Sequence, residues 1–472
     1  MSAAMTPEAR EIMAYLKKHN LAEQLNMIVN KLCKRRSDDP FGFLSSKLHT
    51  LAAPPVITKV DGREIFSSTG LPTVQVDVYC KVDDMVRFVA SGCAAASSSS
   101  SSSSSGKEEE KKDGNEKVQK AVTNISEVIH SVVSGMKPKL QDQCDAVLEK
   151  NKAKIGQQPI TATSIAICKA AASLKDVECF THIRSLIKDD GKETSFKMPK
   201  PMVQLIRGGA YGCNLEFAEV LVYPTSGKSF QAQLKLCARL HNELGNIIAA
   251  KFGEAFRAGC PSGGYSPPLA DLSEALKLVS EAATAAGLDS WNEVGLAVNG
   301  GTWEGTGYVM KQKDKAKGLD EAIQFYVGLA KDNPGLKTLI NPLNPAVDHA
   351  AGEGWSKLTA TLSEDEDLKA NTYTLISESA GKEQIKTLSK VAANVSLKVE
   401  NSVTLTEATN LVVDMMESKL DVTVSGGEDT NDTFVADFAV GVGARFAKFG
   451  GLLGSQNVDK YNRLLQIEAS LS

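Results

Sequence analysis

Residues 396–424 read SLKVENSVTLTEATNLVVDMMESKLDVTV, and this stretch decides the fold. A strand-like run (Ser396–Val399) precedes a helical pattern over 406–418, and a second strand-like run (Asp421–Val424) follows it. The same alternation begins upstream, with strand-like runs at Glu219–Tyr223, Val294–Val298, Leu336–Ile340 and Tyr373–Ile376 and helical runs at 228–253 and 317–333. Such alternation predicts an α/β fold with a (β/α)8-type TIM barrel. Active sites in these barrels lie at the carboxyl ends of the strands.

Composition narrows the class of protein. A chain of 472 residues is long enough for more than one domain. A net charge of −4 gives no reason to expect nucleic acid as a partner. Apolar runs stay below the roughly 18–20 residues that span a bilayer, so no membrane association is expected. The nine cysteines form no Cys-x-x-Cys pair, which favours reduced thiols and predicts no metal site.

The segment 8–50 has the pattern of two short amphipathic helices. Asp39-Pro40 starts the second helix, with Asp as the N-cap and Pro in the first turn. The apolar positions predicted to face a partner are Leu21, Leu25, Ile28, Val29, Leu32, Phe41 and Leu44. Two such helices cannot bury their faces alone. A second copy in a four-helix dimer would cover them, or the globular part of the same chain would.

Three parts are predicted along the chain. Residues 1–52 form the helical segment, 53–197 an α+β domain, and 198–472 the barrel domain. Strand-like runs cover Val56–Val60 and Thr73–Val86. The low-complexity stretch 94–114, with its serine run Ser97–Ser105, predicts a loop of unknown role.

Motifs at both ends of this body resemble enolases. Residues 63–77 (REIFSSTGLPTVQVD) resemble the family's R-E-I-L-D-S-R-G-N-P-T-V-E-V-D. Residues 432–437 (DTFVAD) and 460–468 (KYNRLLQIE) resemble E-D-T-F-I-A-D and K-Y-N-Q-L-x-R-I-E-E. The resemblance implies an enolase-like N-terminal domain before the barrel and dehydration of 2-phosphoglycerate with Mg²⁺. In this family a lysine base works beside metal ions that stabilise the ene-diolate.

The family's three carboxylate ligands to metal are lost in this alignment. Ala297 stands at the aspartate of G-M-D-V-A-A-S-E, and Asn341 stands at the glutamate of S-I-E-D-P. Ser377 stands at the first aspartate of V-G-D-D-L, with Glu378 beside it as a substitute if the register shifts by one. A Mg²⁺ site needs at least one or two carboxylates. No metal or other cofactor is therefore expected, and Mg²⁺ only if the chain is an active enolase.

The acid–base residues are half retained. Lys398 matches the base lysine, Lys448 matches the later strand lysine, and Glu219 matches the glutamate of Q-E-F-M-I-L-P. Three further positions implied by the resemblance are lost: Ser262 replaces the partner glutamate, Tyr211 a histidine, and Ala94 the serine of the lid that contacts metal. The retained residues read as relics of catalysis or as structural charges.

The N-terminal helices resemble the dimerisation/docking helix pair of type II protein-kinase-A regulatory subunits, most specifically at residues 39–44 (DPFGFL). Such pairs bind an amphipathic helix of an anchoring protein. Together with the altered enolase body, this resembles the divergent enolase-like proteins of cilia and sperm flagella. The sequence thus predicts a pseudoenzyme scaffold in a cilium or flagellum axoneme, otherwise cytoplasmic. We expect it to be a homodimer or heterodimer through residues 8–50 and to have an axonemal anchoring partner. The alternative is a phosphopyruvate hydratase acting locally in glycolysis.

Overall fold

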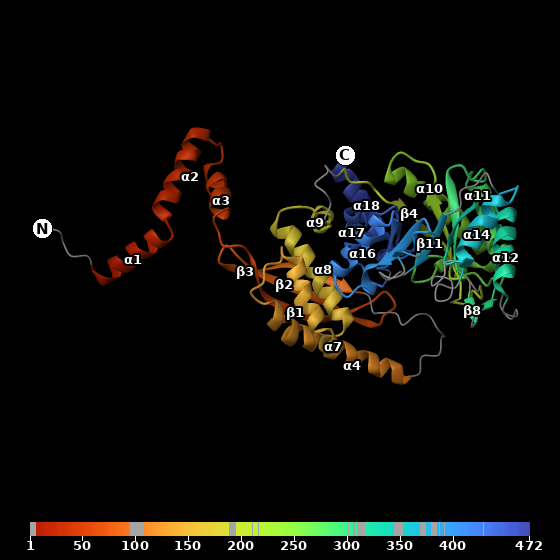
Figure 1. Ribbon diagram of the computed structural model, residues 1–472, viewed down its shortest axis with the longest axis horizontal. Helices are drawn as coiled ribbons and strands as arrows, with labels where there is room; N and C mark the ends of the chain where they lie inside the picture. The colour runs from red at the N-terminus through yellow and green to blue at the C-terminus, as the bar shows by residue number, and fades with distance from the viewer. Residues whose placement is uncertain are drawn as a thin grey trace.

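The computed structural model describes residues 6–94, 108–187, 195–209, 211–215, 217–300, 302–304, 307–309, 317–343, 353–368, 374–378, 385–386, 388–390, 392–427 and 429–472. Three parts follow one another: a helical arm, a domain with a three-stranded sheet, and a barrel (Figure 1). No helix within these residues is both long and apolar enough to cross a membrane.

The arm consists of α1 (Pro7–Lys18), α2 (Leu21–Arg35) and α3 (Pro40–His49). The Asp39 carboxylate accepts a hydrogen bond from the Gly42 backbone N–H at 2.8 Å, so the predicted cap and helical pair are present. α1 is an additional helix ahead of that pair. Figure 1 shows the arm projecting away from the rest of the chain. At its foot, His49 Nδ1 lies 3.0 Å from an Asp83 carboxylate oxygen.

The second part begins with an antiparallel meander of β1 (Val56–Phe66), β2 (Pro72–Val82) and β3 (Met85–Ala94). The strand-like run predicted from Thr73 to Val86 is broken at Asp83 and Asp84, both of which have positive φ. The helices that follow are α4 (Glu108–Asn124), a π-helix (Ile125–Ile129), α5 (His130–Val133), α6 (Gln141–Lys150), α7 (Lys152–Ile155), α8 (Gln157–Leu174) and α9 (Cys179–Leu186).

α8 lies very close to the sheet because both surfaces carry small residues. A Cβ on Gly92 would lie 2.6 Å from the Ala162 carbonyl oxygen and 2.6 Å from the Ala166 nitrogen. Only glycine permits that approach of helix backbone to strand. On the sheet, Val74, Val76 and Val78 are fully buried, so this domain has its own apolar core.

The barrel strands are β4 (Lys200–Pro201), β5 (Val203–Arg207), β6 (Glu219–Pro224), β7 (Val294–Asn299), β10 (Leu336–Ile340), β11 (Thr374–Glu378), β12 (Asn394–Lys398), β13 (Asp421–Ser425) and β14 (Phe446–Lys448). Their order is β4-β14-β13-β12-β11-β10-β7-β6-β5. The ends meet because β4 and β5 are nearly continuous: the Met202 N–H donates to the Ala447 oxygen at 2.8 Å and the Gln204 N–H to the Gly450 oxygen at 3.0 Å. β5, β6 and β7 pair antiparallel, and the remaining neighbours pair parallel.

Helices cover the outside of the barrel: α10 (Phe230–Phe252), α11 (Leu272–Ala285), α12 (Leu319–Asp332), α14 (Glu353–Glu364), α16 (Leu405–Glu417), α17 (Phe434–Val442) and α18 (Ser455–Leu471), with 3-10 turns at Glu254–Ala258 and Val399–Asn401. A small hairpin of β8 (Thr302–Glu304) and β9 (Gly307–Val309) follows β7. The predicted α/β fold class, with an α+β domain before a TIM-type barrel and a helical hairpin ahead of both, is confirmed.

Polar contacts fix the sheet domain against the barrel at the start of α16. The Asp145 carboxylate of α6 accepts from the Thr406 backbone N–H at 2.9 Å and from the Thr406 hydroxyl at 2.6 Å. The Ser164 hydroxyl of α8 accepts from the Leu405 N–H at 2.9 Å. A second contact joins Lys169 to Asp432, whose carboxylate oxygen lies 2.6 Å from Nζ. The loop that carries Lys398 into α16 is thus held by the preceding domain.

Candidate functional site

A buried ion pair lies at the centre of the barrel mouth. Its two members are both among the site residues predicted from the sequence. Lys448 Nζ lies 2.5 Å from a Glu219 carboxylate oxygen, and both side chains are 5% exposed or less. Lys448 ends β14 and Glu219 begins β6, so the pair reaches across the nearly continuous β4–β5 strand that lies between them. An Arg207 guanidinium nitrogen lies 3.8 Å from the same carboxylate.

Two amides complete the surroundings of Glu219. Gln204 Nε2 donates to one carboxylate oxygen at 2.6 Å, and Asn299 Nδ2 donates to the other at 2.7 Å. The Ser262 hydroxyl donates to Gln204 Oε1 at 2.5 Å and so joins the same network. Neither Gln204 nor Asn299 was among the site residues predicted from the sequence. The available signal was strand position, since Glu219 and Asn299 are directly paired across β6 and β7.

Burial raises the pKa of the Glu219 carboxyl, but the charges of Lys448 and Arg207 and the hydrogen bonds it accepts from Lys448 and Asn299 lower it more. The net pKa lies below that of an ordinary glutamate. Glu219 is therefore an ionised, fully engaged acceptor rather than a proton donor. A carboxylate this well satisfied holds the strands together and has little capacity left for a ligand.

Lys398 lies at the same level of the barrel as Lys448. It pairs with Ser425 of β13, and Ser425 pairs with Lys448. Burial raises the pKa of two carboxyls, Glu400 and Asp429. The positive charges of Lys398 and Lys460 lower the pKa of both carboxyls, but by less than burial raises it. The structure thus places two carboxyls near the predicted base Lys398. Glu428, the residue before Asp429, is outside the described residues.

The strands also show which side chains face the lumen. Ala297, Ile340 and Ile376 belong to the apolar cluster that fills it, together with Met202, Leu221, Tyr223 and Phe446. Ile340 is therefore the last residue of β10 to face the lumen. Asn341 follows the strand in a left-handed conformation with φ of 45°.

Strand alternation likewise places Ser377 on the outer side of β11, because its neighbour Ile376 faces the lumen. Ser377 is completely buried there. Ser377 is thus not a lumen position of β11, and Asn341 lies just beyond the end of β10. The side chain of Glu378, the alternative ligand, is outside the described residues.

Two other predicted positions lie away from the ion pair. Tyr211 is 62% exposed on the β5–β6 connection, with φ of 55°. Ala94 is buried as the last residue of β3, paired with Val74. Residues 91–94, which include the predicted lid position Ala94, are strand and pair with β2. Residues 95–107 are outside the described residues.

The described residues at the barrel mouth do not fit a Mg²⁺ ion. Within the described part of the chain, no three His, Cys, Asp or Glu side chains are arranged to hold a metal. Ala297 and Ile340 offer no oxygen, and the oxygens of Glu219 already accept from Lys448, Gln204 and Asn299. Magnesium requires hard oxygen ligands in octahedral geometry.

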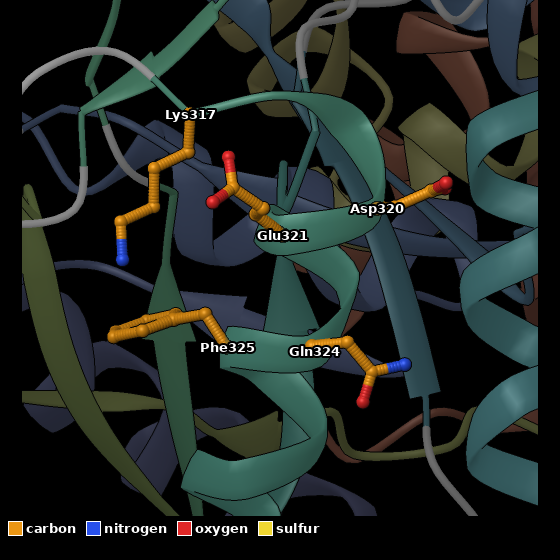
Figure 2. Close-up of a pocket in the computed structure, with 5 residues that line it drawn as sticks. All are labelled: Lys317, Asp320, Glu321, Gln324 and Phe325. Atoms are coloured by element: carbon orange, nitrogen blue, oxygen red, sulfur yellow. The ribbon is translucent and has the colours of Figure 1, made fainter.

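A separate hollow of about 420 Å³ lies on the outer surface at the start of α12. Lys317, Asp320, Glu321, Gln324 and Phe325 line it (Figure 2). None of the predicted site residues is among them. Its charged side chains, one lysine and two carboxylates at the start of one helix, do not form an arrangement typical of a catalytic site.

The docking residues predicted on the arm remain largely uncovered. Phe41 is 81% exposed, Leu25 46% and Val29 45%, whereas Ile28 is buried between the helices of the arm. Leu21, Leu32 and Leu44 are partly exposed. The apolar face therefore exists, and the globular part of the chain does not cover it.

Comparison with known proteins finds two family models. The model described as "Enolase, C-terminal TIM barrel domain" matches residues 195–472, and "Enolase, N-terminal domain" matches residues 57–183. Cytosolic enolase 3 of Arabidopsis thaliana is 29% identical over 478 residues, covering 98% of this chain and 96% of the relative. Enolase of Malacoplasma penetrans is 28% identical over 446 residues, covering 88% and 95%.

Proposed function

The chain belongs to the enolase family, and from that premise we propose that it is a pseudoenzyme, an enolase fold used as a scaffold. The observation that carries the proposal is that the polar groups at the barrel mouth already bind one another. Glu219 is already neutralised by Lys448 at 2.5 Å and held by two amides. The lumen beside it is lined by Ala297 and Ile340.

The chemistry of enolases explains why this arrangement is unfavourable for catalysis. Removing a proton beside a carboxylate creates a dianion, and electrostatic stabilisation of such charge is usually the largest catalytic term. The positive charges of Lys398 and Lys460 are shared with the buried carboxyls Glu400 and Asp429, which leaves less of that charge for an added dianion. The proton donor position is also altered, since Ser262 is engaged with Gln204.

The arm supplies the scaffold's contact surface. We propose that α2 and α3 pair with a second copy, or with a similar hairpin of another protein, and bind an amphipathic anchoring helix. Exposed Phe41, Leu25 and Val29 support this because an uncovered apolar helix face favours association. The location that this predicts is a cilium or flagellum axoneme, with cytoplasm as the alternative.

A second candidate is a divergent phosphopyruvate hydratase. Lys398, Lys448 and Glu219 are retained, and both relatives above are named enolases. The match to cytosolic enolase 3 covers 98% of the chain, so it includes most of residues 1–52. An arm-like extension is therefore compatible with a protein named as an enolase, which favours this alternative.

The deciding measurement is 2-phosphoglycerate dehydration by the full chain at millimolar Mg²⁺, beside an ordinary enolase. We expect no turnover. Activity within about a hundredfold of the control, a barrier difference under about 3 kcal/mol, would instead establish the hydratase, and Lys398→Ala should then abolish it.

A binding readout separates metal loss from slow chemistry. Thermal unfolding of the native chain should not shift with millimolar Mg²⁺, because a ligand that binds only the folded state would raise the midpoint. A clear upward shift would show an intact metal site and contradict the pseudoenzyme.

A further inference from the structure

The turn between α2 and α3 combines a serine with an unusual concentration of charge. Lys34, Arg35 and Arg36 directly precede Ser37, and no other place in the sequence has three consecutive Lys or Arg residues. Ser37 lies between the two helices, outside either one. Its hydroxyl makes one local, exposed hydrogen bond, to the Asp39 carbonyl oxygen at 3.2 Å.

We propose that Ser37 is a phosphorylation site for a basophilic serine kinase, and that the phosphate acts as a switch on the arm. Such kinases recognise cations two and three residues before the acceptor through carboxylates in their peptide groove, a charge-assisted contact that suits Arg and Lys. Lys34 and Arg35 occupy those two positions. The reaction transfers the γ-phosphoryl group of ATP to Ser37 Oγ, the hydroxyl proton is lost, and ADP is the second product.

The local backbone allows the segment to enter a kinase. A substrate must be extended, whereas Lys34 and Arg35 lie in the last turn of α2. That helix ends at Arg36, which has φ of 51°, a left-handed conformation that disfavours a side chain other than glycine. Helix ends open more readily than helix centres, and unwinding here relieves the strain at Arg36.

The structure also indicates what a phosphate would change. The Arg35 guanidinium lies over the Phe43 ring at 5.7 Å, and Lys47 lies over the same ring at 5.8 Å. The Arg35 contact joins the end of α2 to α3, whereas Lys47 and Phe43 both belong to α3. A phosphate on Ser37 carries about −1.5 to −2 charge and offers Arg35 a stronger partner than an aromatic face. It also lies beside Asp38 and the cap Asp39, whose like charge opposes it.

Phosphorylation should therefore draw Arg35 away from Phe43 and loosen the α2–α3 packing on which the apolar face depends. The proposed switch rests on the proposed docking function, because loosening the arm matters only if the arm binds a partner. The proposed phosphorylation of Ser37 does not rest on that function.

The test uses the full chain, ATP with Mg²⁺ and the catalytic subunit of a cyclic-AMP-dependent kinase. Intact mass should show about one phosphoryl group per chain, and peptide mapping should place it on Ser37. Ser37→Ala should abolish incorporation, whereas Ser45→Ala, in α3 without preceding cations, should leave it unchanged. Arg35→Gln should lower kcat/KM of the kinase by about tenfold or more.

Hydrogen exchange of the modified chain then tests the switch. Protection of the backbone amides in residues 21–49 should fall, with the barrel unchanged. Phosphate on another residue, or none on the folded chain, would overturn the site, and unchanged exchange in the arm would overturn the switch. Failure of the docking function would appear separately, as an unmodified chain that neither self-associates nor binds an amphipathic helix.

Discussion

At the scale of single residues, the most consequential feature is that Glu219 and Lys448 satisfy each other. Replacing a buried pair by apolar residues is often tolerated, but removing one partner leaves an uncompensated charge. The two amides lessen that cost without removing it because they carry no charge, and the Arg207 guanidinium lies farther away than Lys448, at 3.8 Å.

Lys448→Met should destabilise the folded chain by about 3 kcal/mol or more, because Glu219 stays buried without its ammonium partner. Urea unfolding measures the change. Glu219→Gln combined with Lys448→Met should cost less than the two single changes summed, since the pair is coupled. Additive costs would show that the ion pair contributes nothing of its own.

The same pair makes stability depend on pH with a definite sign. Because the folded-state pKa of Glu219 is lowered, its contribution is present above the unfolded value of about 4.3 and is lost as pH falls through the folded value. Below about pH 4, the native chain should lose more stability than Lys448→Met does. Parallel pH profiles of the two proteins would contradict this.

At the scale of elements, the N-terminus of α16 is capped from another domain. Asp145 and Ser164 accept from the first backbone N–H groups of this helix, groups that have no partner within the helix itself. The helix follows directly on the segment with Lys398 and Glu400. Its position, and that of the barrel mouth, therefore depends on the sheet domain.

Asp145→Ala should destabilise the protein by about 2 kcal/mol, because the Thr406 N–H and hydroxyl lose a buried acceptor. Asp145→Asn should reduce stability less than Asp145→Ala. Asparagine keeps an acceptor oxygen and carries no charge, whereas burial disfavours the charged form of the Asp145 carboxyl and raises its pKa. Thermal unfolding with Asp142→Ala, on the exposed side of the same helix, provides the control. Equal effects of Asp145→Ala and Asp142→Ala would exclude the capping role.

At the scale of the whole molecule, the arm and the body are nearly independent. The arm meets the sheet domain through His49 and Asp83, both about half exposed, and such surface pairs contribute little. Most of its apolar face points to solvent. Association with another molecule would bury that apolar face and remove it from water.

Val29→Asp should abolish self-association of the full chain while leaving the unfolding midpoint of the body unchanged, because Val29 is 45% exposed and contributes to no core. Sedimentation equilibrium measures the first effect and calorimetry the second. Asn30→Asp, on the opposite side of α2, carries the same added charge and should leave association intact. Equal effects of both changes would indicate charge repulsion rather than an apolar interface.

The sequence by itself determined the fold class, the family and the arm. Alternating strand and helix patterns predict the barrel, and Asp39-Pro40 predicts the start of α3, because both are local properties of the chain. The family motifs also identified Glu219 and Lys448, which the structure brings together.

Only the tertiary structure decided which side chains meet. Ile340 is the last residue of β10 to face the lumen, and Ser377 lies on the outer side of its strand. A shift of one residue reverses every side chain of a strand, and the sequence does not fix that register. Gln204 and Asn299 reach Glu219 from the two strands that flank β6, and Asp145 reaches α16 over a separation of 261 residues. Such contacts depend on how strands and domains pack, which no local pattern encodes.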